Sequence, residues 1–171
     1  LHLQSVHFME KLDKRDKILV LAPKYENEAQ GAKTQVEEFP QRKTHGHEEI
    51  PPLLQIFRSL HANTDLRRFD VSASPQDMAG LSVCKSYDLI VLLTYNAHLF
   101  PRQIEFSRQL LAQKKNVIVA AIRNPYDLQE LQEASTQLAT YGFRECSLKG
   151  LVQALFGEAI PNGKMPVKLE S

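Results

Sequence analysis

The sequence of 171 residues has two cysteines, seven glycines and no tryptophan. Neither Cys84 nor Cys146 belongs to a C-x-x-C pair, which argues against a zinc or thioredoxin-like site. We expect both thiols to behave as small buried hydrophobic side chains. No G-x-G-x-x-G or G-x-x-x-x-G-K-[ST] motif occurs, and the first apolar run is followed by Ala-Pro-Lys-Tyr-Glu-Asn-Glu. The Rossmann and P-loop classes of nucleotide-binding protein therefore do not fit.

An excess of charge of one sign is also missing, because 21 Lys and Arg face 20 Asp and Glu. No long basic block occurs, which argues against a nucleic-acid domain held by phosphate contacts. No apolar run approaches the roughly 18–20 residues of a membrane span. Positions 1–8 lack the pattern of a signal peptide and start without Met, so we expect a piece of a longer polypeptide. Cytoplasmic and secreted locations both stay open.

Short apolar runs alternate with amphipathic stretches along the chain. We expect strands at 17–22, 88–94 and 116–122, each buried on both faces, and less regular strands at 66–71 and 137–140. Helix patterns fall at 50–60, at Ser74 and Pro75, at 101–113, at 127–134 and at 147–156. This order predicts an α/β fold, a flavodoxin-like three-layer α/β/α sandwich with a mostly parallel sheet of about five or six strands. The polar stretch 25–49 is expected to form a loop or a two-stranded excursion.

Polar side chains follow two of the expected strands, at the edge where parallel sheets bind ligands. These candidate ligand-binding residues are Asn96, His98, Arg123, Asn124, Tyr126 and Asp127. Neighbouring parallel strands end on one edge, so we expect these side chains to cluster there. Arg123 offers a planar cationic fork and Asn124 a further hydrogen bond, whereas Asp127 is expected to cap the following helix. The alternative interpretation is an ordinary strand-to-helix turn built from the same residue types.

Two other patterns do not lead to a site. The segment His45-Gly46-His47-Glu48-Glu49 has the residue types of metal ligands without the H-E-x-x-H spacing, so we expect a solvated loop and no metal. No Ser-His-Asp set and no pair of carboxyls converges on a common point, so no catalytic residue is assigned and no cofactor is implied. The residues by themselves are typical of a domain that assists chemistry performed elsewhere.

The second half of the chain has a recognisable order of motifs. It runs through Phe-Pro-Arg at 100–102, Arg-Asn-Pro-Tyr-Asp at 123–127, Thr-Tyr-Gly-Phe at 140–143 and Ala-Leu-Phe-Gly-Glu-Ala-Ile-Pro-Asn-Gly-Lys-Met-Pro-Val at 154–167. This order resembles the C-terminal domain of family 3 glycoside hydrolases, most of all that of two-domain bacterial β-N-acetylglucosaminidases. The closing F-G-x-x-x-P-x-G-[KT]-[LM]-P-V pattern is its most specific element. Positions 17–23 are similar to the first strand of that domain.

The resemblance implies a domain order and a division of labour. Residues 1–15 would be the connector from a missing N-terminal (β/α)8 barrel, and residues 16–171 would be the C-terminal domain. In relatives of this kind the barrel carries an Asp nucleophile and an Asp–His acid/base pair, and none of those motifs occurs here. The β-glucosidase branch places its acid/base Glu in the second domain, but the matching stretch 94–103 contains no Asp or Glu. The resemblance therefore implies an accessory domain that is inactive alone.

The whole enzyme would hydrolyse terminal N-acetylglucosaminides in cell-wall or chitin-type oligosaccharides. The implied partners are the barrel of the same polypeptide and the carbohydrate substrate, with no cofactor, metal, nucleic acid or membrane span. A domain made to face a barrel should expose an apolar patch, for which Phe143 and 161–166 are candidates. A stand-alone flavodoxin-like module that binds a small ligand or a partner stays open, as does a β-glucosidase-type family 3 domain.

Overall fold

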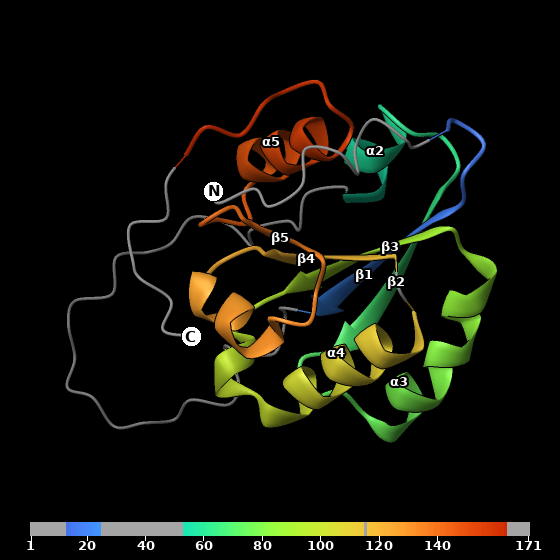
Figure 1. Cartoon of the computed structure of the whole chain (residues 1–171), viewed down its shortest axis with the longest axis vertical. Coiled ribbons are helices and arrows are strands. Elements are labelled where there is room, and N and C mark those ends of the chain that lie inside the picture. The colour runs from blue at the N-terminus through green and yellow to red at the C-terminus, as the bar shows by residue number, and fades with distance from the viewer. Residues whose placement is uncertain (1–12, 25–52, 115, 164–171) are drawn as a thin grey trace, which may run out of the picture.

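The computed structural model describes residues 13–24, 53–114 and 116–163 (Figure 1). Its strands form one parallel sheet in the order β2-β1-β3-β4-β5. They are β1 (Ile18–Lys24), β2 (Thr64–Asp70), β3 (Leu89–Thr94), β4 (Val117–Ala121) and β5 (Thr136–Ala139). The predicted α/β fold and all the predicted strands are confirmed. The stretch 25–49 lies outside the described residues.

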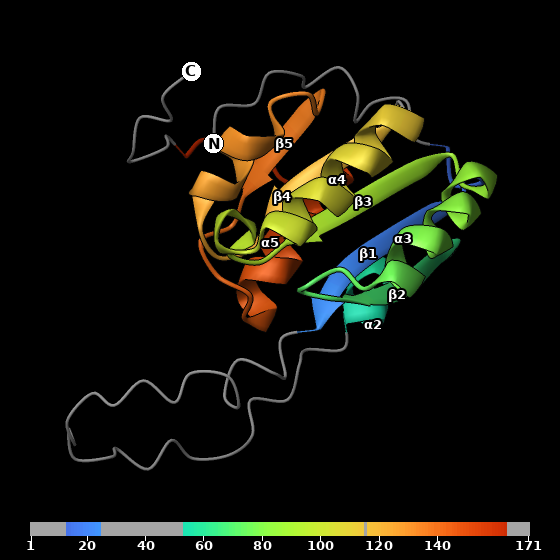
Figure 2. The ribbon, with the colours of Figure 1, turned by 90° about the horizontal axis from the view of Figure 1, so that it is seen from below.

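Helices cover both faces of this sheet, which makes the three layers (Figure 2). One layer contains α2 (Leu53–Arg58) and α5 (Glu145–Leu155). The other contains α3 (Pro75–Ala79), the 3-10 segment η2 (Gly80–Ser86), α4 (Pro101–Gln113) and the 3-10 segment η4 (Pro125–Leu131). A short 3-10 turn, η3 (Ala97–Leu99), leads from β3 into α4. No helix in these described ranges is long and apolar enough to cross a membrane.

Two hydrophobic clusters, one on each face, explain why β3 and β4 are continuous apolar runs. Every residue of both strands is buried. Val91 and Leu93 pack toward α2 and α5, whereas Ile90 and Leu92 pack toward α4 and η4. A strand covered on both faces has no solvent-facing positions to fill with polar residues. The continuous apolar runs in the sequence therefore follow from the cover of helices on both faces of the sheet.

The helix starts follow from local capping chemistry. Ser74 and Asp77 form a reciprocal capping box at α3, with Pro75 in the first turn. The expected α-helix at 127–134 is wrong, because the chain forms η4 there, from Pro125 onward. The side chain of Gln137 donates to the carbonyls of Leu128 (3.1 Å) and Leu131 (2.7 Å), so carbonyls of η4 are satisfied by β5.

The two thiols differ in environment. Cys84 in η2 is buried, as predicted, and burial raises the pKa of its thiol above the ordinary value. The expectation that Cys146 is buried is wrong, because it lies exposed in the first turn of α5. The buried stripe of α5 instead consists of Leu148, Leu151, Val152, Ala154 and Leu155.

Candidate functional site

The carboxyl edge of the sheet is defined by the last residue of β2 with the residues after it, 70–73, and by the described segments that follow β3, β4 and β5: 95–98, 123–127 and 140–143. The order β2-β1-β3 means that the chain continues to opposite sides of β1. Parallel α/β sheets bind ligands beyond the carboxyl ends of the strands at such a reversal of strand order. The six predicted site residues all lie on this edge: Asn96 and His98 follow β3, and Arg123, Asn124, Tyr126 and Asp127 follow β4.

Arg123 is held at the surface by an aromatic ring. Its Nη1 donates to the hydroxyl of Tyr95, and its Cζ lies 5.1 Å from the centroid of the Tyr95 ring. Tyr95 is 3% exposed and packs edge-on against Phe143, with ring centroids 5.6 Å apart. The ends of β3, β4 and β5 thus share one cluster, and the exposed guanidinium is oriented before any ligand arrives.

A buried glutamine fixes the backbone beneath this cluster. Gln103 in α4 is fully buried; its Oε1 accepts from the Tyr95 N–H at 3.2 Å, and its Nε2 donates to the Tyr95 carbonyl at 3.4 Å. The same Nε2 donates to the Val71 carbonyl at 3.4 Å, so one side chain joins the ends of β2 and β3. Sequence reasoning missed Tyr95 and Gln103. For Gln103 the available signal was its position, as a polar residue on the apolar face of the helix predicted at 101–113.

His98 and Asp127 form the second cluster of the edge. Asp127 is fully buried, and its Oδ1 accepts from the His98 backbone N–H at 3.1 Å and lies 2.7 Å from His98 Nδ1. The His98 side chain keeps 22% of its surface exposed, and the Tyr126 ring meets it edge-on at 6.1 Å. Asp127 Oδ2 is buried and has no hydrogen-bond partner within the described part of the chain.

The helix cap is made by Asn124 and not by Asp127, which corrects the prediction. Asn124 Oδ1 accepts from the Tyr126 N–H at 3.2 Å, because its extended backbone places the side chain over the first turn of η4. Asp127 points inward to His98 instead. The structure therefore brings His98, Tyr126 and Asp127 together and places Arg123 against Tyr95. The amide oxygen of Asn124 is occupied as the cap of η4.

Backbone strain gathers on the same edge. Three non-glycine residues among those described have a positive φ: Ala73 (47°), Asn96 (50°) and Tyr141 (55°). They follow β2, β3 and β5, each within three residues of the strand end. A left-handed conformation costs a non-glycine residue roughly 1–2 kcal/mol. Such strain is concentrated in proteins at sites whose geometry serves function.

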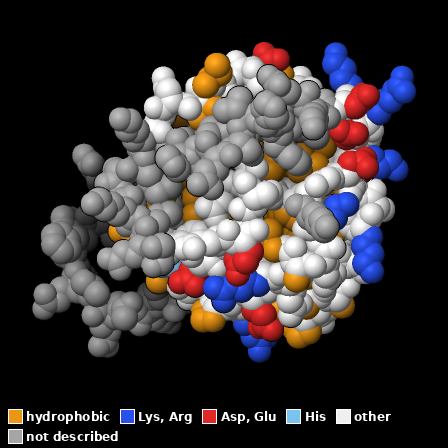
Figure 3. All heavy atoms as spheres, viewed as in Figure 1, with side chains coloured by type: hydrophobic (Ala, Val, Ile, Leu, Met, Phe, Trp, Pro, Cys, Tyr) orange, Lys and Arg blue, Asp and Glu red, His pale blue; other side chains and the backbone are white. Residues whose placement is uncertain are grey.

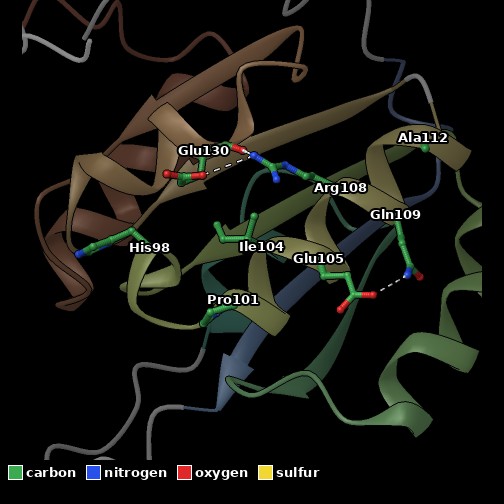
Figure 4. A pocket seen from close by; sticks show the side chains of 8 residues that line it. All are labelled: His98, Pro101, Ile104, Glu105, Arg108, Gln109, Ala112 and Glu130. Atoms are coloured by element: carbon green, nitrogen blue, oxygen red, sulfur yellow. Dashed lines mark hydrogen bonds and ion pairs between the residues drawn. The ribbon is translucent and has the colours of Figure 1, made fainter. Parts of the chain in front are cut away.

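A cavity of about 580 Å³ lies beside the carboxyl edge, between α4 and η4 (Figure 4). Arg108 closes one wall, because its Nη2 donates to the Glu130 carbonyl at 3.0 Å and pairs with Glu130 Oε2 at 3.4 Å. His98 lies at one end of this cavity. The lining residues are His98, Pro101, Ile104, Glu105, Arg108, Gln109, Ala112 and Glu130.

The surface near this edge is partly apolar. Leu99 (63% exposed), Tyr126 (42%) and Tyr141 (45%) are large side chains that face solvent there. Phe143, one of the candidates for an exposed patch, is half-buried against the core cluster under α5. Of the predicted segment 161–166, positions 164–166 lie outside the described residues. In the view of Figure 3, acidic and basic side chains alternate, with no large field of one sign.

Metal binding finds no support in the described ranges. No group of three or more His, Cys, Asp or Glu side chains there could hold a metal ion. The candidate segment at 45–49 lies outside those ranges, so its interpretation as a solvated loop stays a prediction.

Solved structures that share this fold include two family 3 β-N-acetylglucosaminidases. One is a glycoside hydrolase family 3 β-N-acetylglucosaminidase from Paenibacillus sp. str. FPU-7, with a TM-score of 0.71 and 23% identity over 92% of this chain and 28% of that chain. The other is a fungal multi-domain family 3 β-N-acetylglucosaminidase with a GCN5-related glucosamine N-acetyltransferase region, with a TM-score of 0.60 and 22% identity over 92% of this chain and 17% of that one.

This chain therefore spans less than a third of either neighbour. No family model matches it, and no curated protein matches it. At such low identity the likeness shows a shared fold. The resemblance that the motifs predicted is confirmed at that level, because the neighbours are family 3 β-N-acetylglucosaminidases.

Proposed function

We propose that this chain is the accessory C-terminal domain of a family 3 β-N-acetylglucosaminidase that acts on terminal N-acetylglucosaminides of cell-wall or chitin-type oligosaccharides. The fold likeness carries the proposal, since it covers 92% of this chain and only 28% of the Paenibacillus enzyme. In this proposal, residues 1–15 connect to an N-terminal barrel of the same polypeptide, and that barrel holds the catalytic groups.

The acidic side chains at the carboxyl edge of the sheet support an accessory role. A retaining glycosidase needs two carboxyls about 5–5.5 Å apart on either side of the scissile bond. The described segments of this edge contain two carboxyls, Asp70 and Asp127. Asp127 is fully buried, and Asp70 is bound by the Ser72 hydroxyl at 2.6 Å and the Ser72 N–H at 2.9 Å. With Asp127 buried, these segments offer no pair of accessible carboxyl groups that could flank a scissile bond.

The carboxyl edge would instead complete the sugar site at the mouth of the barrel. Arg123 would donate to a carbonyl or hydroxyl of the substrate, and its prior contact with Tyr95 lowers the entropy lost on binding. Asn96, Asn124 and Tyr126 would add polar and ring contacts beside it. The exposed Leu99, Tyr126 and Tyr141 would pack against the barrel, since exposed apolar side chains gather at interaction surfaces.

Turnover of an aryl β-N-acetylglucosaminide tests this function. The polypeptide encoded by the full reading frame, including the sequence upstream of Leu1, should hydrolyse it, whereas the 171-residue chain alone should not. An aryl β-glucoside is the matched second substrate. Preference for the β-glucoside would favour the β-glucosidase type. Turnover by the purified chain, or a start codon directly before Leu1 with no barrel, would contradict the proposal, and the latter would favour a stand-alone binding module.

A further inference from the structure

The position of one hydrogen atom on His98 follows from what its ring faces. Nδ1 lies 2.7 Å from Asp127 Oδ1, and an ionised carboxylate oxygen can only accept. Nδ1 therefore carries the hydrogen. In a neutral imidazole the other nitrogen, Nε2, then has a free lone pair. Within the described residues Nε2 forms no hydrogen bond, and it belongs to a partly exposed side chain at the carboxyl edge.

Stability alone does not explain Asp127. Its carboxylate is fully buried, and both hydrogen bonds fall on Oδ1, so Oδ2 has no partner among the described residues. Buried polar atoms are nearly always paired, and an unpaired one calls for an explanation, of which a functional role is one. Here the carboxylate fixes both the backbone and the ring of a single residue, His98. That is how carboxylates orient functional histidines.

His61 shows what a structural histidine looks like in the same molecule. It is 4% exposed, its Nε2 faces the Asp13 carbonyl at 3.2 Å, and its ring stacks on Phe156. A carbonyl oxygen only accepts, so the hydrogen of His61 lies on Nε2. The two described histidines are thus expected to be opposite tautomers. Nδ1 of His61 lies 3.4 Å from the Thr64 hydroxyl, whereas Nε2 of His98 has no partner among the described residues.

We propose that His98 Nε2 binds the sugar by accepting a hydrogen bond from one of its hydroxyl groups, and that Asp127 is the positioning residue that keeps this lone pair available. The inference rests on the proposed function and extends it to a specific atom. The groups that face His98 are the Asp127 carboxylate on η4 and the Tyr126 ring, with Glu105 and Arg108 of α4 and Glu130 of η4 farther along the cavity. A sugar is the fitting ligand class because its hydroxyls are donors as well as acceptors.

The tautomers can be read from nitrogen chemical shifts in the ¹⁵N-histidine-labelled chain near neutral pH. His98 should show a protonated, pyrrole-type Nδ1 and an unprotonated, pyridine-type Nε2, and His61 should show the reverse. His98→Asn and His61→Asn assign the signals by deleting them. A hydrogen on His98 Nε2, in either the other tautomer or the imidazolium, would overturn the proposal without reference to any enzyme activity.

Two substitutions then separate binding from structure in the full polypeptide. In His98→Asn the side-chain amide nitrogen lies as many bonds from Cβ as Nδ1 does in histidine. Asp127 therefore keeps a donor, while the contact made by Nε2 is lost. In His98→Gln the amide reaches the position of Nε2 and the Nδ1 contact is lost. We expect kcat/KM to fall about three- to tenfold in His98→Asn, the loss of one neutral hydrogen bond, and to fall less in His98→Gln.

A purely structural His98 gives the opposite order, with His98→Asn close to wild type and His98→Gln the more damaged in both melting temperature and turnover. That result would overturn the inference and leave the proposed function standing. A wild-type polypeptide without any glycosidase activity would instead remove the proposed function, and the sugar contact with it. His61→Asn is the control, since it should lower the melting temperature and leave kcat/KM unchanged.

Discussion

The two edges of the sheet use polar residues in different ways. At the amino edge, where the strands begin, polar side chains bind neighbouring backbone. Asp88 Oδ2 accepts from the Lys17 N–H at 2.8 Å, Asn63 donates to the Arg15 carbonyl at 2.9 Å, and Asn116 donates to the Asp88 carbonyl at 3.2 Å. These contacts satisfy the groups that precede each strand, and such pairing stabilises the fold.

At the carboxyl edge the backbone is strained, and Arg123 faces outward while Asp127 points inward. Ala73, Asn96 and Tyr141 adopt the left-handed conformation, Arg123 is exposed, and Asp127 is buried with one oxygen unpaired among the described residues. The positive φ angles and the unpaired buried oxygen both cost stability. The difference teaches that the amino edge maintains the fold and that the carboxyl edge maintains a geometry, which is what a binding surface requires.

The largest expected effect comes from the buried carboxylate. Asp127→Ala should lower the free energy of unfolding by about 3 kcal/mol, because it leaves the His98 N–H and ring without their charged acceptor. Asp65→Ala is the matched control. Asp65 is exposed, pairs with Arg58 and accepts from the Tyr87 hydroxyl at 2.9 Å, so its loss should cost only about 1 kcal/mol. Urea denaturation measures both. Equal losses would mean that the buried Asp127 carboxylate stabilises the fold no more than an exposed ion pair does.

Arg123→Ala is expected to reduce kcat/KM about ten- to a hundredfold in the full polypeptide, through loss of a charge-assisted hydrogen bond to substrate. Because Arg123 is exposed, the melting temperature should change little. Arg58→Ala, which removes an exposed arginine from α2, should leave the kinetics unchanged. Steady-state kinetics and thermal unfolding decide the matter. Unchanged turnover with a lower melting temperature would assign the segment 123–127 to an ordinary strand-to-helix turn.

Because the backbone is strained at the carboxyl edge, glycine should be more stable than alanine there and less stable than alanine at the amino edge. Tyr141→Gly should be more stable than Tyr141→Ala by about 1 kcal/mol, since both remove the ring and only glycine relieves the positive φ. Ala62→Gly, at an exposed amino-edge bend outside the positive-φ set, should instead lose about 0.5–1 kcal/mol. Denaturant titrations of the three variants test this. The same sign at both positions would show that Tyr141 is not strained.

The smallest expected effect depends on pH. The Ser72 hydroxyl, followed by the Ser72 N–H, lowers the pKa of Asp70 below its ordinary value of 3.8. A lowered pKa stabilises the fold above the unfolded-state value and loses that effect as pH falls through the folded value. Ser72→Ala should therefore cost about 0.5 kcal/mol at neutral pH and nothing once Asp70 is protonated. A cost that persists in acid would mean that the hydroxyl acts on something other than the carboxylate.

Much of this fold could be predicted because the burial of a strand is visible in the residue types of that strand alone. The runs that became β3 and β4 are apolar at every position, and Pro101 marks the start of α4 in the sequence itself. The clustering of site residues on one edge also followed from parallel strands. Cys146 was wrongly expected to be buried, because helix phase near the first turn of α5 depends on where that helix begins.

The pairings within the site could not be predicted, since their partners are distant in the chain. His98 and Asp127 are separated by 29 positions, and Gln103 meets Val71 across 32. Local pattern gave Asp127 the role of a cap, which Asn124 fills three residues earlier. Both residues are ordinary cap formers, so only the packed helix layer determines which one turns inward.

Chemical-shift mapping tests the central claim, that the carboxyl edge meets the catalytic part of the polypeptide. The ¹⁵N-labelled chain would be titrated with the upstream part expressed as a separate protein. Shift changes should gather at Asn96, His98, Arg123 and Tyr126 and spare Asn63 and Asp88 at the amino edge. Changes that gather at the amino edge, or no changes at all, would contradict the account.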